Sequence, residues 1–265
     1  ELAAAAAREA LQAAELPPAA LDLILVATST PDELLPGDAP RLQAALGAQP
    51  QGGAWDVSAA CTGFLAALQL ARGQIEAGLV RSALVVGADR PSAWLAPDDR
   101  DTQVVFADGA GAAVLRAAPG ERGLLAHHTW VDGAAADALR TVGGGGADPA
   151  ARPRLHMNGA VVFRHAARDV ARVARAACEA AGWPLTAVRW WVPHQANARV
   201  TQSLIRRLGL APDRVVRHLR DVGNTSAASV PLALHAHQAR FRPGDAMVLC
   251  GLGAGLTASA VALRW

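Results

Sequence analysis

Trp55-Asp56-Val57-Ser58-Ala59-Ala60-Cys61-Thr62-Gly63-Phe64 is the stretch from which the architecture of the chain can first be inferred. A short strand-like run ends in small residues, and the apolar positions from Phe64 to Leu70 then recur at helical spacing. This pattern places Cys61 at the turn where a strand gives way to a helix. A thiol there feels the positive end of the helix dipole, so we expect a lowered pKa and a nucleophilic thiolate.

Two other stretches supply the partners that a cysteine nucleophile needs. Pro193-His194-Gln195-Ala196-Asn197 follows the apolar run 188–192, and Gly223-Asn224-Thr225-Ser226 opens another helical pattern. Each residue alone has an ordinary interpretation, because free cysteines are usually buried hydrophobes, a histidine after a strand is usually a core residue, and asparagine is a favoured N-cap. The combination of Cys61, His194 and Asn224 favours an active site.

Six strings spread over the chain resemble the thiolase superfamily and, within it, the β-ketoacyl-acyl-carrier-protein synthase III family. They are DVSAACTGF (56–64), FADGAGAAVL (106–115), MNGAVVFR (157–164), WVPHQAN (191–197), GNTSAASVPLAL (223–234) and GLGAGLT (251–257). Weaker similarity reaches back to Leu2, inside an alanine-rich helical pattern. The resemblance therefore implies that the N-terminal segment of the family is lacking from this sequence.

The resemblance implies an α/β fold of the thiolase type, layered αβαβα and made of two similar halves. Internal repetition agrees, because LDLILVAT (21–28) is similar to VRWWVPH (188–194), and TQVVFADGAGAAVLRA (102–117) to AMVLCGLGAGLTASAVALRW (246–265). We expect a N-terminal half with the nucleophile at 1–118, a connecting loop region at 119–156, and a C-terminal half with His194 and Asn224 at 157–265. Strands are also predicted at 21–27, 82–88, 103–106 and 110–116, and a helix at 225–240.

Composition narrows the class of protein. The chain has 265 residues, and its formal net charge of +2 at pH 7 is too small to indicate a nucleic-acid partner. Three cysteines form an odd number, which favours a reduced cytoplasmic protein over a disulfide scaffold. We find no apolar run that is long enough to cross a bilayer, so no membrane partner is expected.

The resemblance assigns a role to each candidate. Cys61 would attack an acyl thioester and hold the acyl group, and His194 and Asn224 would stabilise the enolate that forms when a malonyl thioester loses CO2. The backbone N–H groups of Cys61 and Ala254 would hold the tetrahedral oxyanion. Relatives often carry glycine at position 254, so alanine is acceptable there only with a negative φ. No cofactor is implied beyond coenzyme A thioesters as substrates.

Further residues are assigned to substrate binding by resemblance alone. Contacts to coenzyme A are implied for Arg100, Gly159, Phe163, Asn197 and Arg199, and an acyl pocket for Leu35, Trp94, Phe106 and Leu155. Arg164, Arg206 and Arg207 would form a rim for an acidic carrier protein, although an arginine stripe is equally often a solvated helix face. We interpret Trp94 either as a residue that limits primer length or as one that packs at a subunit interface.

The remaining motifs and residues do not indicate a further function. GLGAG lacks the spacing of a dinucleotide fingerprint, so that function is excluded. Cys250 lies near a second catalytic position of degradative thiolases but one residue out of register, and we expect it and Cys178 to be structural. The remaining histidines have no motif around them, so no metal site is expected.

The resulting hypothesis is a homodimeric acyltransferase that transfers an acyl-CoA primer to Cys61. It then condenses the primer with malonyl acyl carrier protein, which begins fatty acid or related polyketide synthesis. Two alternatives stay open. One is a secondary-metabolism acyltransferase or starter-unit synthase of the same fold, and the other is an inactive subunit of a heterodimeric synthase. The sequence leaves the chain length of the primer open.

Overall fold

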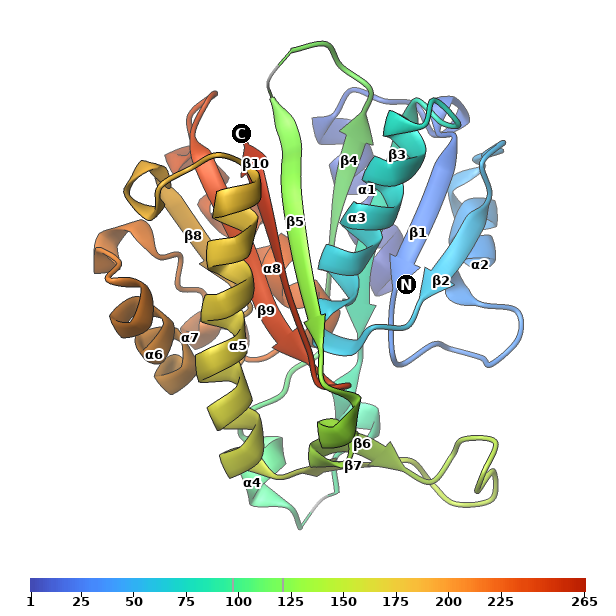
Figure 1. Cartoon of the computed structure of the whole chain (residues 1–265). Helices are drawn as coiled ribbons and strands as arrows, with labels where there is room; N and C mark the ends of the chain where they lie inside the picture. The colour runs from blue at the N-terminus through green and yellow to red at the C-terminus, as the bar shows by residue number, and fades with distance from the viewer. Residues whose placement is uncertain (97, 121) are drawn as a thin grey trace.

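The computed structural model describes residues 1–96, 98–120 and 122–265, apart from the side chain of residue 101. The described residues form two four-stranded sheets and one two-stranded sheet. In Figure 1 the two larger sheets lie side by side, with helices around and between them. The helices are α1 (Leu2–Ala13), α2 (Asp38–Leu46), α3 (Gly63–Glu76), α4 (Arg100–Gln103), α5 (Gly159–Ala180), α6 (Ala198–Leu208), α7 (Leu219–Val222) and α8 (Ser229–His237). The strands are β1 (Leu23–Ala27), β2 (Ala54–Val57), β3 (Ser82–Asp89), β4 (Gly109–Arg116), β5 (Gly123–Val131), β6 (Leu139–Val142), β7 (Arg154–Met157), β8 (Trp190–Pro193), β9 (Ala246–Gly253) and β10 (Thr257–Arg264).

The two sheets repeat one plan. The first has the order β2-β1-β3-β4, and the second has the order β5-β10-β9-β8. β1 and β3 run parallel and β3 and β4 antiparallel, and the same relations hold for β8, β9 and β10 in the second sheet. The predicted duplication is therefore present, and the first sheet's β2 has only a single bridge, Trp191 to Val215, as its counterpart.

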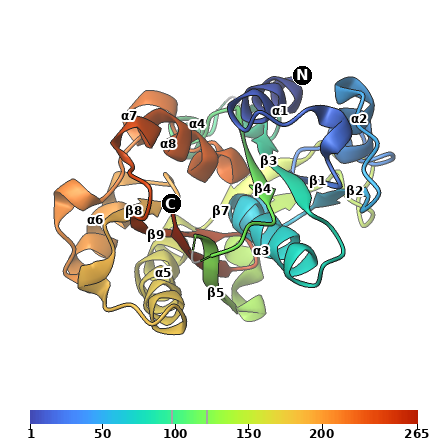
Figure 2. The same ribbon diagram turned by 90° about the horizontal axis from the view of Figure 1, so that it is seen from above.

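Five layers result from the way in which the apolar faces are buried. α1 and α2 cover the outer face of the first sheet, α3 and α8 lie between the sheets, and α5 and α6 cover the outer face of the second (Figure 2). The central strands β1 and β9 carry no charged residue because both of their faces are covered, and every residue of these two strands is buried. The predicted thiolase-like αβαβα fold is confirmed.

Several local predictions need correction. Residues 119–156 are more than a loop, because they contain β5, which pairs along β10 from Val131–Thr257 to Gly123–Arg264, and the β6–β7 hairpin. The strand predicted at 103–106 is absent, since Gln103 ends α4 and Phe106 makes only an isolated bridge to Asn224. The helix predicted at 225–240 is shorter, because α8 is flanked by 3₁₀ turns. No helix in the described part of the chain is long and apolar enough to cross a membrane.

Candidate active site

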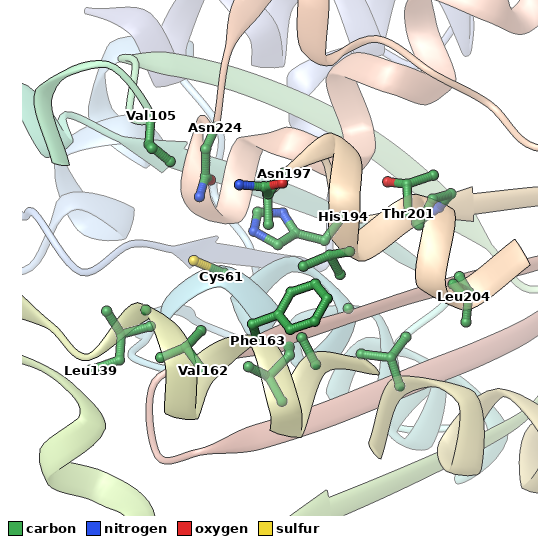
Figure 3. Close-up of a pocket in the computed structure, with 18 of the residues that line it drawn as sticks. Cys61, Val105, Leu139, Val162, Phe163, His194, Asn197, Thr201, Leu204 and Asn224 are labelled. Carbon is green, nitrogen blue, oxygen red and sulfur yellow. The ribbon is translucent and has the colours of Figure 1, made fainter. Parts of the chain in front are cut away.

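Cys61, His194 and Asn224 line one cavity of about 130 Å³, here called the histidine cavity. Cys61 lies in the 3₁₀ turn Ala60–Thr62 between β2 and α3, and His194 directly follows β8. Asn224 lies between α7 and the turn that leads into α8. Figure 3 shows the sulfur, the imidazole ring and the amide gathered around one space. Residues from both halves of the chain therefore meet shortly before the starts of three helices, α3, α6 and α8, as the sequence predicts.

The Cys61 thiol is buried, and its protonation state differs from the expectation. Ala60, directly before it, has a φ of 46°, in the left-handed region, and Cys61 Sγ lies 3.6 Å from Ser226 Oγ. Burial raises the pKa of the thiol to about 11, the Ser226 hydroxyl partly offsets this rise, and the Asp89 carboxylate adds to it. The predicted lowering of the pKa is wrong, because the loss of hydration outweighs the effect of the helix N-terminus.

His194 is a neutral, buried imidazole. Its backbone N–H donates to Cys250 O at 2.7 Å, and burial lowers the pKa of the ring to about 4. Neither ring nitrogen has a hydrogen-bond partner among the described residues. A Cβ at Gly251 would stand only 2.8 Å from His194 Cβ, so a glycine is needed on the neighbouring strand. The ring is thus held in place with its polar atoms left for a ligand.

Gln195, which the sequence analysis did not single out, fixes the chain on the far side of His194. Its Nε2 donates to Pro193 O at 2.6 Å, and its Oε1 accepts from the backbone N–H groups of His218 and Leu219 at 2.7 and 3.1 Å. Its own backbone N–H donates to Ser229 Oγ at 2.7 Å. The side chain of Gln195 is only 2% exposed, and such burial of a polar group indicates a structural role. The sequence alone reveals neither this burial nor the hydrogen-bond partners.

Asn224 presents one end of its amide to the cavity. Its Oδ1 accepts from Ser226 N at 2.9 Å, so the amide nitrogen is the group left to donate. The backbone is held on both sides, because Asn224 N donates to Val105 O and Ala107 N donates to Asn224 O, each at 2.9 Å. The side chain therefore has a defined direction, toward the thiol and the imidazole in Figure 3.

A second cavity, of about 440 Å³, also borders Cys61 and is called the tryptophan cavity. It is lined by three of the four residues predicted for an acyl pocket, Trp94, Phe106 and Leu155. Leu155 N donates to Trp94 O at 3.1 Å, which holds the Trp94 segment against β7. Leu35 is the exception, because its side chain is 86% exposed and lines neither cavity.

The turn that would complete an oxyanion site lies against Cys61. A Cβ at Gly253 would stand 3.0 Å from both Cys61 N and Thr62 N, so the turn can approach these amides only with glycine at that position. Ala254 follows Gly253 and lines the tryptophan cavity together with Cys61. Among the described residues other than glycine, only Glu15, Ala60 and Ser226 have a left-handed φ. Ala254 therefore meets the condition that the sequence analysis set for it.

Comparisons with known proteins identify the family. The profile described as "3-Oxoacyl-[acyl-carrier-protein (ACP)] synthase III" matches residues 55–133, and its C-terminal counterpart matches residues 178–265. The β-ketoacyl-[acyl-carrier-protein] synthase III of Rhodospirillum rubrum is 44% identical over 271 residues, covering 100% of this chain and 83% of the relative. The chain belongs to the 3-oxoacyl-[acyl-carrier-protein] synthase III family. It is accordingly an acyltransferase.

Other similar proteins carry names that point to different products or pathways. The 3-oxopimeloyl-[acyl-carrier-protein] synthase of Rhodothermus marinus is 42% identical, covering 100% of this chain and 79% of the relative. The crystal structure of 3-oxoacyl-(acyl carrier protein) synthase III from Pseudomonas aeruginosa is 43% identical with a TM-score of 0.93, covering 100% of this chain and 82% of that one. The priming β-ketosynthase of the R1128 polyketide pathway is 36% identical with a TM-score of 0.92, covering 99% and 80%.

The remaining residues that family resemblance assigns to substrate binding fall into two groups, those that line a cavity and those that lie on the surface. Gly159, Phe163 and Asn197 line the histidine cavity, and Asn197 Oδ1 also caps α6 by accepting from Arg199 N at 2.8 Å. The five predicted arginines line neither cavity and are exposed; they are Arg100, Arg164, Arg199, Arg206 and Arg207. Within the described residues, no group of three histidine, cysteine or acidic side chains is arranged to hold a metal ion.

Proposed function

We propose that this synthase transfers an acyl group from coenzyme A to Cys61 and condenses it with malonyl acyl carrier protein. The observation that carries the proposal is the meeting of a buried thiol with two uncharged donors, His194 and Asn224, in one cavity. Such donors can stabilise an enolate, which simple transfer to a hydroxyl does not require.

The first step is acyl transfer to the thiol. Because the thiol is protonated at rest, it must lose its proton as it attacks, and the unpartnered ring of His194 is the nearby base. Sγ bonds to the thioester carbonyl carbon, and the resulting oxyanion faces the amides of Cys61 and Ala254. The C–S bond to coenzyme A then breaks, and the departing thiolate takes up the proton.

The second step is decarboxylative condensation. When the malonyl thioester loses CO2, its carbonyl oxygen gains negative charge, which His194 and Asn224 stabilise by hydrogen bonds. A neutral imidazole suits this role because it donates a hydrogen bond without protonating the carbanion early. The carbanion then attacks the acyl carbonyl on Cys61, the thiolate leaves, and the β-ketoacyl carrier protein is released.

The tryptophan cavity would hold the acyl chain of the primer, and one of its residues favours a second candidate substrate. Arg140 lines this cavity and pairs with the exposed Asp137 at 3.3 Å. A guanidinium at the cavity wall would suit a primer with a carboxylate at its far end. The Rhodothermus marinus relative is named for such a product, because a 3-oxopimeloyl group carries a second carboxylate. The likeness to a polyketide priming synthase keeps a starter-unit role as the other candidate.

We further propose that the enzyme is a homodimer in the cytoplasm. Leu34 and Leu35, between β1 and α2, are 83% and 86% exposed, and adjacent leucines of this kind are suited to burial against a second copy. Cys61, Cys178 and Cys250 are all free, which fits a reducing compartment. The exposed arginines on α5 and α6, Arg164, Arg206 and Arg207, would face the acidic carrier protein, and Arg100 and Arg199 the coenzyme A phosphates.

The test is to mix the protein with malonyl carrier protein and either acetyl-CoA or glutaryl-CoA, and to follow CO2 and the β-ketoacyl product. We expect product from at least one primer, with Cys61→Ala as the inactive control. Arg140→Leu should lower the rate with glutaryl-CoA selectively if the carboxylate primer is the substrate. Acylation of Cys61 without CO2 release would indicate an acyltransferase, and no acylation by any primer would indicate an inactive subunit.

A further inference from the structure

Asp89, the last residue of β3, is a carboxylate that is only 3% exposed and has no role in the chemistry described above. Its Oδ1 accepts hydrogen bonds from Thr28 Oγ1 at 3.2 Å, Ser29 N at 2.7 Å and Thr30 Oγ1 at 3.2 Å. Its Oδ2 accepts one from Ala227 N at 3.1 Å. No ion pair is formed by Asp89 with the described residues, so hydrogen bonds alone compensate for burying the charge.

The two oxygens join the two halves of the chain. Oδ1 accepts hydrogen bonds from the loop that follows β1, and Oδ2 accepts one from the turn that leads into α8. This turn holds Ser226, which has a φ of 50° and whose hydroxyl lies 3.6 Å from Cys61 Sγ. β3 also contacts the turn directly, since a Cβ at Gly87 would stand only 2.4 Å from Ala227 O. Glycine at that position is what allows Asp89 to come within reach of Ala227 N.

Two side chains thus hold the turn, in addition to its own hydrogen bond from Ala228 N to Thr225 O at 3.0 Å. Asn224 Oδ1 accepts from Ser226 N at its beginning, and Asp89 accepts from Ala227 N one residue later. If the second bond were lost, Ser226 would no longer be confined to its left-handed conformation, which is unfavourable for any residue but glycine. The hydroxyl beside the thiol and the amide of Asn224 would then lose their common support.

We propose that Asp89 is a positioning residue for the reactions at Cys61, holding the Ser226–Ala227 turn so that the Ser226 hydroxyl faces the thiol for acyl transfer and the Asn224 amide faces it for condensation. The proposal rests on the proposed function. The carboxylate also acts on the thiol through its charge, because it adds to the rise in the pKa of Cys61 that burial causes. His194 is neutral, so Asp89 is the charged group that acts on the thiol from the described part of the site.

The test uses Asp89→Asn with Asp22→Asn as the matched control. Asp22 has a comparable structural task at the opposite end of the same sheet, where Oδ2 accepts from Arg81 N at 2.7 Å and Ser82 N at 3.0 Å. Alkylation of Cys61 by iodoacetamide is followed by peptide mass spectrometry across a pH series, and acyl transfer from acetyl-CoA is measured separately. Urea unfolding reports stability for each variant.

Asp89→Asn should move the pH midpoint of alkylation downward, because a negative charge beside the thiol is lost, and should slow acyl transfer by roughly tenfold or more, because the turn loses an anchor. Asp22→Asn should change neither. The proposal is overturned if Asp89→Asn leaves the midpoint and the transfer rate unchanged, or if both variants lose activity only in proportion to stability.

Ser226→Ala provides a second route if Asp89→Asn does not fold. It removes the hydroxyl and leaves the Asp89 bonds in place, so the alkylation midpoint should move upward and acyl transfer should slow; an unchanged midpoint and rate would overturn the role given to the turn. Alkylation requires no substrate. A wild-type protein without condensing activity would therefore refute the proposed function and leave the alkylation result independent of it.

Discussion

His194 should make the stability of the protein depend on pH in a way that His194→Gln removes. The ring is buried with a pKa of about 4, against an ordinary value of 6.5 for an exposed histidine. Between these two values the unfolded chain binds a proton that the folded chain does not, so stability falls as the pH falls through this window. Well above pH 6.5 both states are neutral at this position, and the contribution is constant.

The magnitude follows from the two pKa values. One pKa unit corresponds to about 1.4 kcal/mol, so the complete loss by pH 4 is about 3 kcal/mol. Between pH 7 and about pH 5 the same relation gives a loss of about 2 kcal/mol. Glutamine is uncharged at every pH in this range, so its fixed effect on stability cancels when the two pH values are compared within one protein.

The measurement is urea unfolding of wild type, His194→Gln and His127→Gln at both pH values and at one protein concentration. His127, exposed on β5, is the control, and its variant should lose as much stability on acidification as the wild type. His194→Gln should lose about 2 kcal/mol less than either. Equal losses in all three proteins would mean that His194 is not held neutral, and the hydrogen-bonding role proposed for it in condensation would fail.

Three further predictions concern the chemistry. Cys61→Ala should abolish labelling by radioactive acyl-CoA, whereas Cys250→Ala should retain it, since Cys250 is buried in the core of the second half; a persistent acyl mass shift in Cys61→Ala would refute the assignment. Asn224→Ala should still be acylated but should lose malonyl decarboxylation by about 10²–10³-fold, the usual effect of removing one oxyanion donor. Equal damage to both half-reactions would mean that Asn224 mainly supports the fold. Trp94→Ala should improve the binding free energy of decanoyl-CoA relative to acetyl-CoA by roughly 1–3 kcal/mol, because the indole lines the tryptophan cavity. An unchanged ranking of acetyl-, hexanoyl- and decanoyl-CoA as primers would exclude Trp94 as the determinant of primer length.

The sequence predicts those parts of the molecule that local pattern controls. Continuously apolar runs such as 23–27 indicate strands covered on both faces, and the strings around Cys61, His194 and Asn224 indicate where helices begin. β5 was missed because its sequence mixes histidine, threonine and tryptophan with leucine, and it becomes a strand only by pairing with β10, more than a hundred residues later. Long-range pairing of this kind has no local signal.

The protonation state of Cys61 was mispredicted for a related reason. The local pattern shows the helix that follows the thiol, but not the residues that bury it. Those come from the other half of the chain, the Ser226 turn and the strand β9. The positioning roles of Gln195 and Asp89 are hidden in the sequence for the same reason, because such a role can be inferred only when the hydrogen-bond partners are known. Gln195 Nε2 donates to the carbonyl of Val216, which lies 21 residues away, and Asp89 accepts from the backbone N–H of Ala227, which lies 138 residues away.

The duplication of the fold explains why one half carries the nucleophile and the other its support. Two equivalent turns meet between the sheets, and each has a left-handed residue, Ala60 or Ser226, followed directly by a residue whose backbone N–H can bind a negative charge. In the first turn that residue is Cys61, whose N–H lies beside the glycine turn after β9 and, on the proposed function, would be available to a transient oxyanion. In the second it is Ala227, whose N–H donates to the carboxylate of Asp89 at the end of β3. On the proposed function, the same backbone geometry would thus bind a negative charge twice. In the second turn the charge is the Asp89 carboxylate, which belongs to the chain, and in the first it would be the oxyanion that the substrate supplies.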